Sequence, residues 1–196
     1  MGWIRAVTLQ GQHVRLEPLA LSDAAEMAEA VSDGRLWELW FTSIPKPEHV
    51  SAYIERALRM QQDQGALAFV VREQSSGRLL GCTRYFAVDE LNQRLEIGHT
   101  WYRASAQRGP FNTEAKLLLL SHAFEALQAM AVEFRTHWHN TRSRAAIARL
   151  GAKQDGVLRH HQRSADGVIR DTVVFSIIAP EWPAVRQNLR FRLMQG

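Results

Sequence analysis

The feature that most constrains the fold is a long apolar helix pattern enclosed between two strand patterns. Residues 113–128 carry apolar side chains at two interlocking helical spacings, Ala115, Leu118, Leu119, Ala123 and Ala126 along one and Leu117, Leu120, Phe124 and Leu127 along the other. A helix that is apolar almost all round is buried. Strand patterns at 94–102 and 132–138 flank it, so this region predicts a right-handed βαβ unit with two parallel strands.

The rest of the chain alternates between helix and strand patterns. Before this unit we expect a strand at 13–17, helices at 23–32 and 47–62, and strands at 67–72 and 79–88. After it we expect a helix from Asn140-Thr141 to Gly151, a hairpin of 157–161 and 168–177 around the turn 164–167, and a helical tail at 182–194. Short links between the middle strands predict an antiparallel meander. The order predicts one mixed α/β (α+β) domain, with a sheet of six or seven strands flanked by helices.

Composition and charge narrow the class of protein. The chain of 196 residues suits one domain, and its single cysteine, Cys82, excludes an intramolecular disulfide and a cysteine-based zinc site. Residues 1–134 hold 13 basic and 16 acidic residues, whereas residues 135–196 hold 11 basic and 4 acidic ones. This basic third indicates either a phosphate-bearing partner or an ordinary basic surface. No signal peptide or membrane span is visible, so we expect a cytoplasmic protein that does not engage a membrane.

The loop before the apolar helix has the composition of an anion site. It reads Gln107-Arg108-Gly109-Pro110-Phe111-Asn112-Thr113, with a glycine, a fixed positive charge and two residues of the N-cap type. In open α/β sheets ligands bind where such a loop enters a helix, because free backbone amides and the helix dipole attract phosphate. The alternative is a simple turn and cap without a ligand.

Several stretches together resemble one family of enzymes. They read Leu95-Glu96-Ile97-Gly98-His99-Thr100-Trp101-Tyr102, then Gln107-Arg108-Gly109, then Asn112-Thr113-Glu114-Ala115-Lys116, then Asn140-Thr141-Arg142-Ser143-Arg144-Ala145-Ala146-Ile147, then Leu150-Gly151-Ala152. Their order and spacing resemble the GNAT superfamily of acyl-CoA N-acyltransferases, and within it the branch that includes the ribosomal-protein N-terminal acetyltransferases. The resemblance covers residues 10–178, which leaves an N-terminal extension at 1–9 and a basic C-terminal tail at 179–196.

The resemblance implies direct transfer of an acyl group, by default acetyl, from acyl-CoA to the primary amine of a small molecule or protein N-terminus. The cofactor-binding residues it implies are Trp101, Tyr102, Arg108, Gly109, Phe111, Asn112, Thr113, Asn140, Ser143 and Arg144. The CoA pyrophosphate would lie on the amides of 108–113, and the pantetheine arm in a gap where strand 94–102 splays from strand 132–138. It implies no metal, and a homodimer is compatible with it.

Two departures from the family pattern bear on this expectation. Pro110 stands where the family loop usually has glycine, and it removes one amide donor. Ile147 stands where many members carry a tyrosine that protonates the leaving thiolate, so another group or water must serve.

Candidate catalytic and acceptor residues carry two interpretations each. Glu96 lies where the family often places a general base, or it is a strand carboxylate bonded to a neighbouring loop. Trp37, Trp40 and Phe41 lie in the connection that borders the acceptor pocket in this family; they line that pocket, or Trp37 and Trp40 pin a short helix to the core. Arg84 on the middle strand is a further pocket candidate. Strict strand alternation directs His99 away from Glu96 as a core histidine. His137 and His139 share a strand face without a clear third metal ligand.

A second class of function remains open at this level. The departure at Pro110 and the basic third of the chain are compatible with a GNAT fold whose cofactor site has degenerated into a binding module. Such a module would hold RNA or an acidic protein, and its nucleic-acid affinity would fall steeply with salt. No RNA-binding motif is present, so nucleic acid is the less favoured partner.

Overall fold

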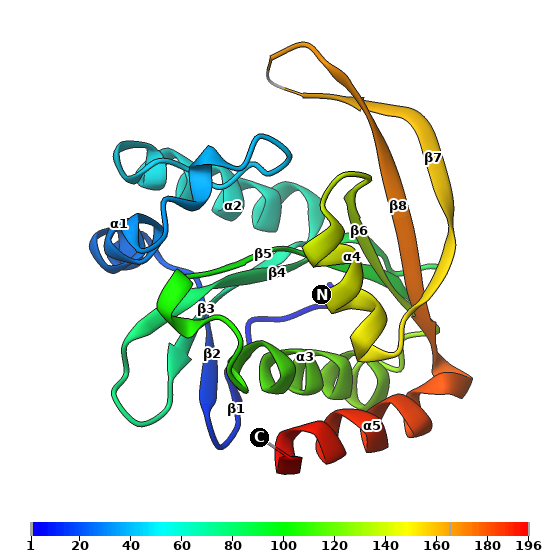
Figure 1. Cartoon of the computed structure of the whole chain (residues 1–196). Helices are drawn as coiled ribbons and strands as arrows, with labels where there is room; N and C mark the ends of the chain where they lie inside the picture. The colour runs from blue at the N-terminus through cyan, green and yellow to red at the C-terminus, as the bar shows by residue number, and fades with distance from the viewer. Residues whose placement is uncertain (1, 165, 196) are drawn as a thin grey trace.

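A sheet of eight strands forms the centre of the computed structural model, which describes residues 2–164 and 166–195 (Figure 1). Across the sheet the strands lie in the order β1-β2-β3-β4-β5-β6-β8-β7. Their bounds are β1 Leu9–Gln10, β2 Val14–Pro18, β3 Leu67–Glu73, β4 Leu79–Asp89, β5 Arg94–Tyr102, β6 Ala131–His137, β7 Lys153–Arg163 and β8 Ile169–Ile178. Only β5 and β6 pair in parallel; every other neighbouring pair is antiparallel.

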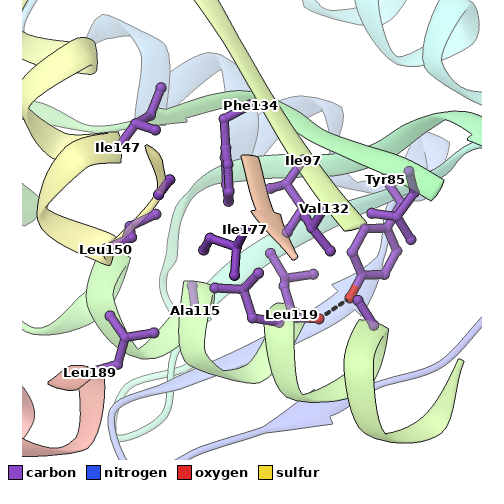
Figure 2. Packing of buried hydrophobic residues seen from close by; sticks show 14 of the residues in the cluster. Tyr85, Ile97, Ala115, Leu119, Val132, Phe134, Ile147, Leu150, Ile177 and Leu189 are labelled. Carbon is purple, nitrogen blue, oxygen red and sulfur yellow. Dashed lines mark hydrogen bonds between the residues drawn. The ribbon is translucent and has the colours of Figure 1, made fainter. Parts of the chain in front are cut away.

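Five helices cover the two faces of this sheet. They are α1 Ala24–Ser32, α2 Val50–Gln64, α3 Phe111–Ser121, α4 Thr141–Leu150 and α5 Trp182–Gln195. The buried apolar residues of α1 and α2 form one cluster with one face of the sheet, and those of α3, α4 and α5 form a second cluster with the other. Figure 2 shows the second cluster, in which Leu119 of α3 points toward Val132 of β6 and Ile177 of β8.

The parallel pair comes apart soon after it begins. β5 pairs with β6 only where Arg94, Leu95 and Glu96 lie opposite Ala131, Val132 and Glu133. Beyond Glu96 the two strands diverge, so the side of β5 that faces β6 has no strand partner from 97 to 102. The expected α/β domain with a splayed central pair is therefore confirmed, with eight strands instead of six or seven because Leu9 and Gln10 add a short edge strand.

Several element boundaries differ from the sequence expectations. α3 begins at Phe111, not Thr113, and it gives way at His122 to a π-helical turn that ends at Ala126. The last hairpin is longer than expected and extends well beyond the body of the sheet (Figure 1). Ala165 of the predicted hairpin turn lies outside the described residues.

Both ends of the chain pack on the core. The indole nitrogen of Trp3 donates to the carbonyl of Leu127 at 2.9 Å. The expected helical tail is confirmed as α5, and its side chains Trp182, Val185 and Leu189 are buried. No helix among the described residues is long and apolar enough to cross a membrane.

Candidate active site

Glu96 lies at the closed end of the gap between β5 and β6. Its neighbours Leu95 and Ile97 point into the core beneath α3, so alternation turns Glu96 to the opposite face, which α1 and α2 cover. Its side chain is 5 % exposed, and Oε2 lies 3.5 Å from Nε of Arg135. Burial raises the pKa of Glu96 to about 7, and the charge of Arg135 opposes part of that rise. A carboxyl with this pKa is suited to exchange protons near neutrality.

The strand β5 carries a bulge two residues beyond Glu96. Cys82 pairs with Trp101 and Arg84 with Gly98, so two residues, His99 and Thr100, lie opposite one, and His99 has a φ of 50°. The expectation that His99 faces away from Glu96 is wrong, because the bulge interrupts the alternation. The ring of His99 meets that of Phe86, which lies opposite Glu96, at 4.8 Å. Burial lowers the pKa of His99 to about 4, which keeps the ring neutral.

Arg84 lies on the same face, under α2, and is 2 % exposed. Its guanidinium lies 5.7 Å from the ring centre of Tyr53 and donates to Sδ of Met60 at 3.1 Å. No carboxylate of the described chain forms an ion pair with it, and its Nε is buried without a hydrogen-bond partner. Arg84 therefore places a guanidinium without an ion-pair partner in the described chain on the same face as Glu96.

The aromatic residues predicted to line the acceptor pocket separate into two places. Trp37 is half-buried and packs on the cluster formed by α1 and α2. Trp40 is 60 % exposed, and its ring meets His137 at 5.0 Å and His139 at 5.6 Å. Phe41 lies against Trp40 at 5.6 Å. Trp40 and Phe41 thus lie over the end of β6, whereas Trp37 serves the core.

The start of α3 carries the free amides that a phosphate site requires. Pro110 occupies the N-cap position, and the first amide used inside the helix is that of Glu114, which donates to the carbonyl of Pro110 at 2.9 Å. Hence the amides of Phe111, Asn112 and Thr113 have no partner within the helix. Asn112 and Thr113 lie in the first turn instead of capping it, because the helix begins two residues earlier than expected. The missing amide of Pro110 therefore falls outside this row of donors.

Two side-chain and backbone details at this turn bear on CoA. The buried Oδ1 of Asn112 has no hydrogen-bond partner among the described residues, so an acceptor atom awaits a donor there. Arg108, not Gly109, adopts the left-handed conformation, with φ at 69°. A Cβ on Gly109 would meet the ring of Phe111 at 3.5 Å, which is an ordinary contact. The free amides suit the phosphates of a ligand, and the unpartnered oxygen of Asn112 suits a hydrogen-bond donor elsewhere on the same ligand.

The other predicted cofactor residues lie along the gap or at its far edge. Trp101 and Tyr102 are buried on opposite faces of β5, in the stretch that pairs with β4 but no longer with β6. The side-chain oxygen of Asn140 accepts from the amide of Ser143 at 3.1 Å and so caps α4. Arg144 donates to the carbonyl of Trp138 and lies 4.4 Å from the centre of its ring. The termini of α3 and α4 therefore both follow the diverging strands, one from β5 and one from β6.

Lys116 is a functional candidate that the sequence reasoning did not single out. It lies on α3 and is 5 % exposed, and its Nζ donates to Oγ1 of Thr100 at 3.0 Å and of Thr83 at 3.3 Å. Burial lowers the pKa of Lys116 to about 7. Thr100 belongs to the part of β5 that has left β6, so this amine lies directly behind the gap. The available signal was one lysine within an otherwise apolar helix.

A cavity of about 250 Å³ lies beyond the end of β6 and joins Trp40, His137 and His139 to hairpin residues that the sequence did not single out. Its walls are Trp40, His137, Trp138, His139, Arg159, His160, Val168, Ile169, Arg170 and Asp171. The hairpin register shifts between Leu158 and Gln162, and His160 has a φ of 53°, so a bulge interrupts the alternation there. Alternation alone places His160 and His161 on opposite faces, and no sequence signal announced the bulge. No group of three or more His, Cys, Asp or Glu in the described ranges is arranged to hold a metal ion.

A gap between diverging parallel strands, beside a helix N-terminus with free amides, is the arrangement that the sequence resemblance implied for acyl-CoA-dependent N-acetyltransferases. The profile of the family described as "Acetyltransferase (GNAT) domain" matches residues 13–153, and the chain belongs to this family. It is thus an acyl-CoA-dependent N-acetyltransferase by family, as the sequence resemblance predicted.

Similar proteins from bacteria support this assignment. A protein of Bacillus subtilis (strain 168) named "Putative ribosomal N-acetyltransferase YdaF" is 26 % identical over 178 residues, which cover 87 % of this chain and 94 % of that protein. The solved structure of a "putative acetyltransferase" from T. thermophilus is 34 % identical, with a TM-score of 0.85 and coverage of 98 % and 100 %. A GCN5-related N-acetyltransferase from Brucella melitensis is 28 % identical, also with a TM-score of 0.85, and the match covers 98 % and 87 %.

Proposed function

We propose that this protein transfers the acetyl group of acetyl-CoA to a primary amine, with Glu96 as the general base. The observation that carries the proposal is the buried Glu96, whose pKa is raised to about 7 by burial at the closed end of the gap. An acceptor amine arrives protonated at neutral pH and must lose a proton before it can attack. The acceptor is either a small molecule or a protein N-terminus, and the Bacillus subtilis relative's name favours the second.

The chemistry needs one proton acceptor and one leaving group. Glu96 takes a proton from the acceptor ammonium, and the freed amine nitrogen attacks the thioester carbonyl carbon. The carbon–sulfur bond breaks, and CoA leaves as the thiolate. Ile147 is buried in the core and offers no proton to this sulfur, so the second proton of the attacking nitrogen, released as the amide forms, reaches the thiolate through water.

We assign the CoA site to the gap and to the helix that follows it. The free amides of Phe111, Asn112 and Thr113, together with Arg108, suit the pyrophosphate. The unpartnered side of β5 from 97 to 102 suits the amides of the pantetheine arm. Asn140, Ser143 and Arg144 flank the gap from the start of α4.

A titration of the protein with CoA tests this assignment. We expect saturable binding below millimolar CoA, because three amides and a fixed arginine charge meet the pyrophosphate. Absence of binding at millimolar CoA contradicts the proposal. If the protein instead bound RNA with an affinity that falls steeply with salt, the chain would be the binding module considered above.

The variant Glu96→Gln tests the proposed base. We expect the turnover number for acetyl transfer to fall roughly 100-fold or more, because general bases contribute about 10²–10⁴-fold. CoA affinity should stay at the level of the parent protein. The parent rate should rise with pH through about 7 as the Glu96 carboxyl ionises, and the variant should lack this limb. Unchanged turnover in the variant would remove Glu96 as the base.

A further inference from the structure

Arg170 of β8 presents a guanidinium that no acidic side chain of the described chain contacts. Its side chain is half-buried, its Nε is buried without a hydrogen-bond partner, and no carboxylate of residues 2–164 or 166–195 forms an ion pair with it. The neighbouring arginines differ, since Arg135 contacts Glu133 and Glu96, and Arg159 contacts Asp171. A guanidinium withdrawn from water gains most from a planar anion that accepts two hydrogen bonds.

The cavity around Arg170 is positively charged and has an aromatic wall. Asp171 is its only acidic lining residue, and both of its oxygens are engaged, by Nε of Arg159 at 2.7 Å and by the amide of His160 at 2.9 Å. Trp40 also lines the cavity, with its ring edge-on to His137. The cavity therefore offers a free cationic fork beside a flat apolar surface.

Arg170 and Glu96 belong to the same face of the sheet. Thr172 pairs with His137 across β8 and β6, and alternation places Arg170 and Arg135 on the face that these two share. Arg135 contacts Glu96, and the charges of Arg170 and Glu96 stabilise each other without a hydrogen bond between them. The cationic fork thus lies along the same face as the proposed base.

We propose that Arg170 binds an anionic group, a carboxylate or a phosphate, carried by the amine acceptor, while the amine of that acceptor faces Glu96. This inference rests on the proposed transferase function and narrows its acceptor. The cavity of about 250 Å³ lies below the roughly 300–1,000 Å³ of pockets that enclose whole drug-sized molecules. It therefore takes the anionic group with a short stem, against the ring of Trp40.

Matched pairs of acceptors test the anion preference. We expect the kcat/KM for acetyl transfer to be about tenfold or more higher for phenylalanine than for phenylalaninamide, and for 2-aminoethyl phosphate than for ethanolamine. In both pairs the compound without the anionic group has the more acidic ammonium group and hence more free amine. Its intrinsic reactivity therefore opposes the expected result. The two pairs also distinguish a carboxylate from a phosphate. An equal or higher kcat/KM for both acceptors that lack the anionic group overturns the proposal.

The variant Arg170→Gln tests whether this side chain is responsible. We expect the preference for the anionic member of each pair to fall about tenfold, toward a ratio of one. Arg163→Gln is the matched control, because Arg163 lies near the exposed tip of the same hairpin and donates to the carbonyl of Gly167. This control should keep the preference of the parent protein. An equal loss for both members of each pair in Arg170→Gln contradicts the assignment.

A binding measurement separates this inference from the proposed function. In calorimetric titrations of the protein with saturating CoA, phenylalanine should bind more tightly than phenylalaninamide, and Arg170→Gln should abolish the difference. Such selective binding without acetyl transfer would contradict the transferase proposal and retain the anion site. Equal binding of acid and amide would refute the anion site, whatever the rate of transfer.

Discussion

At the scale of single residues, Lys116 is an amine buried in the core, where its charge is unfavourable, and the sequence gives only a weak sign of this burial. A lysine inside an apolar helix is either a solvated side chain or a buried amine, and helix periodicity alone does not decide between them. The structure buries it between α3 and the hydroxyls of Thr83 and Thr100, which lie 2.8 Å apart. The choice depends on the register of β4 and β5, and no local pattern specifies that register.

The burial of Lys116 makes the stability of the protein depend on pH. The pKa of this amine is lowered by burial to about 7, whereas in the unfolded chain it is about 10.5. Between these values the unfolded state binds more protons, so the free energy of unfolding rises with pH, by at most about 1.4 kcal/mol per unit. We expect this rise between pH 7.5 and 8.5 in urea unfolding, where the Glu96 carboxyl, whose pKa burial raises to about 7, is largely ionised and opposes it little, and expect Lys116→Met to lack it.

The control for this experiment is Lys153→Met, which removes an exposed lysine paired with Glu181. It should keep the pH dependence of the parent protein. The pH window lies below the usual thiol pKa of 9.0 with which Cys82 ionises in the unfolded chain, and burial raises that pKa to about 11 in the folded protein. An identical slope for the parent protein and Lys116→Met would show that the amine is hydrated in solution.

At the scale of elements, helix ends were harder to predict than helix existence. Asn112 and Thr113 are good N-cap types, yet α3 begins at Phe111, since Pro110 already has helical φ and is tolerated where no amide donor is needed. Asn140 is predicted correctly as a cap, because nothing before it competes for that position. Two bulges, at His99 and His160, interrupt strand alternation, and the first turns His99 toward the face of Glu96. No local sequence pattern announces either bulge, so the side-chain directions around them could not be predicted.

Two variants of Asn140 distinguish its role as the cap of α4 from a role in CoA binding. Asn140→Ala removes the acceptor of the Ser143 amide and should cost about 1 kcal/mol of unfolding free energy. Asn140→Ser keeps a neutral capping oxygen and should retain most of that stability. If the side-chain amide of Asn140 contacts CoA, both variants should bind CoA more weakly. Urea unfolding and calorimetry check the two effects, and parent-like CoA affinity in both variants would exclude the contact.

At the scale of the whole molecule, the order of elements was predictable and the role of the chain ends was not. Hydrophobic period identified the strands and helices, and the single parallel pair followed from the βαβ connection. The ends carry weaker patterns, so residues 1–9 and 179–196 were expected to lie outside the domain. In the structure both meet the turn that follows α3, where Trp3 bonds to Leu127 and Trp182 stacks on Phe124. Part of the basic charge of the last third thus serves packing, as in the pair Arg186–Glu125.

Because α5 closes one side of the core, removing the indole of Trp182 should greatly reduce the free energy of unfolding. The ring of Trp182 is buried, lies 5.4 Å from that of Phe124, and donates from Nε1 to Glu125 at 2.9 Å. Trp182→Ala should therefore lower the unfolding free energy by about 3–5 kcal/mol in urea titrations. Phe191→Ala, on the same helix but with a ring that is 56 % exposed, should change it by about 0.5 kcal/mol or less. If α5 closes the core, loss of the buried Trp182 ring must leave a cavity. Similar small decreases in unfolding free energy for Trp182→Ala and Phe191→Ala would therefore mean that α5 packs only loosely on the core.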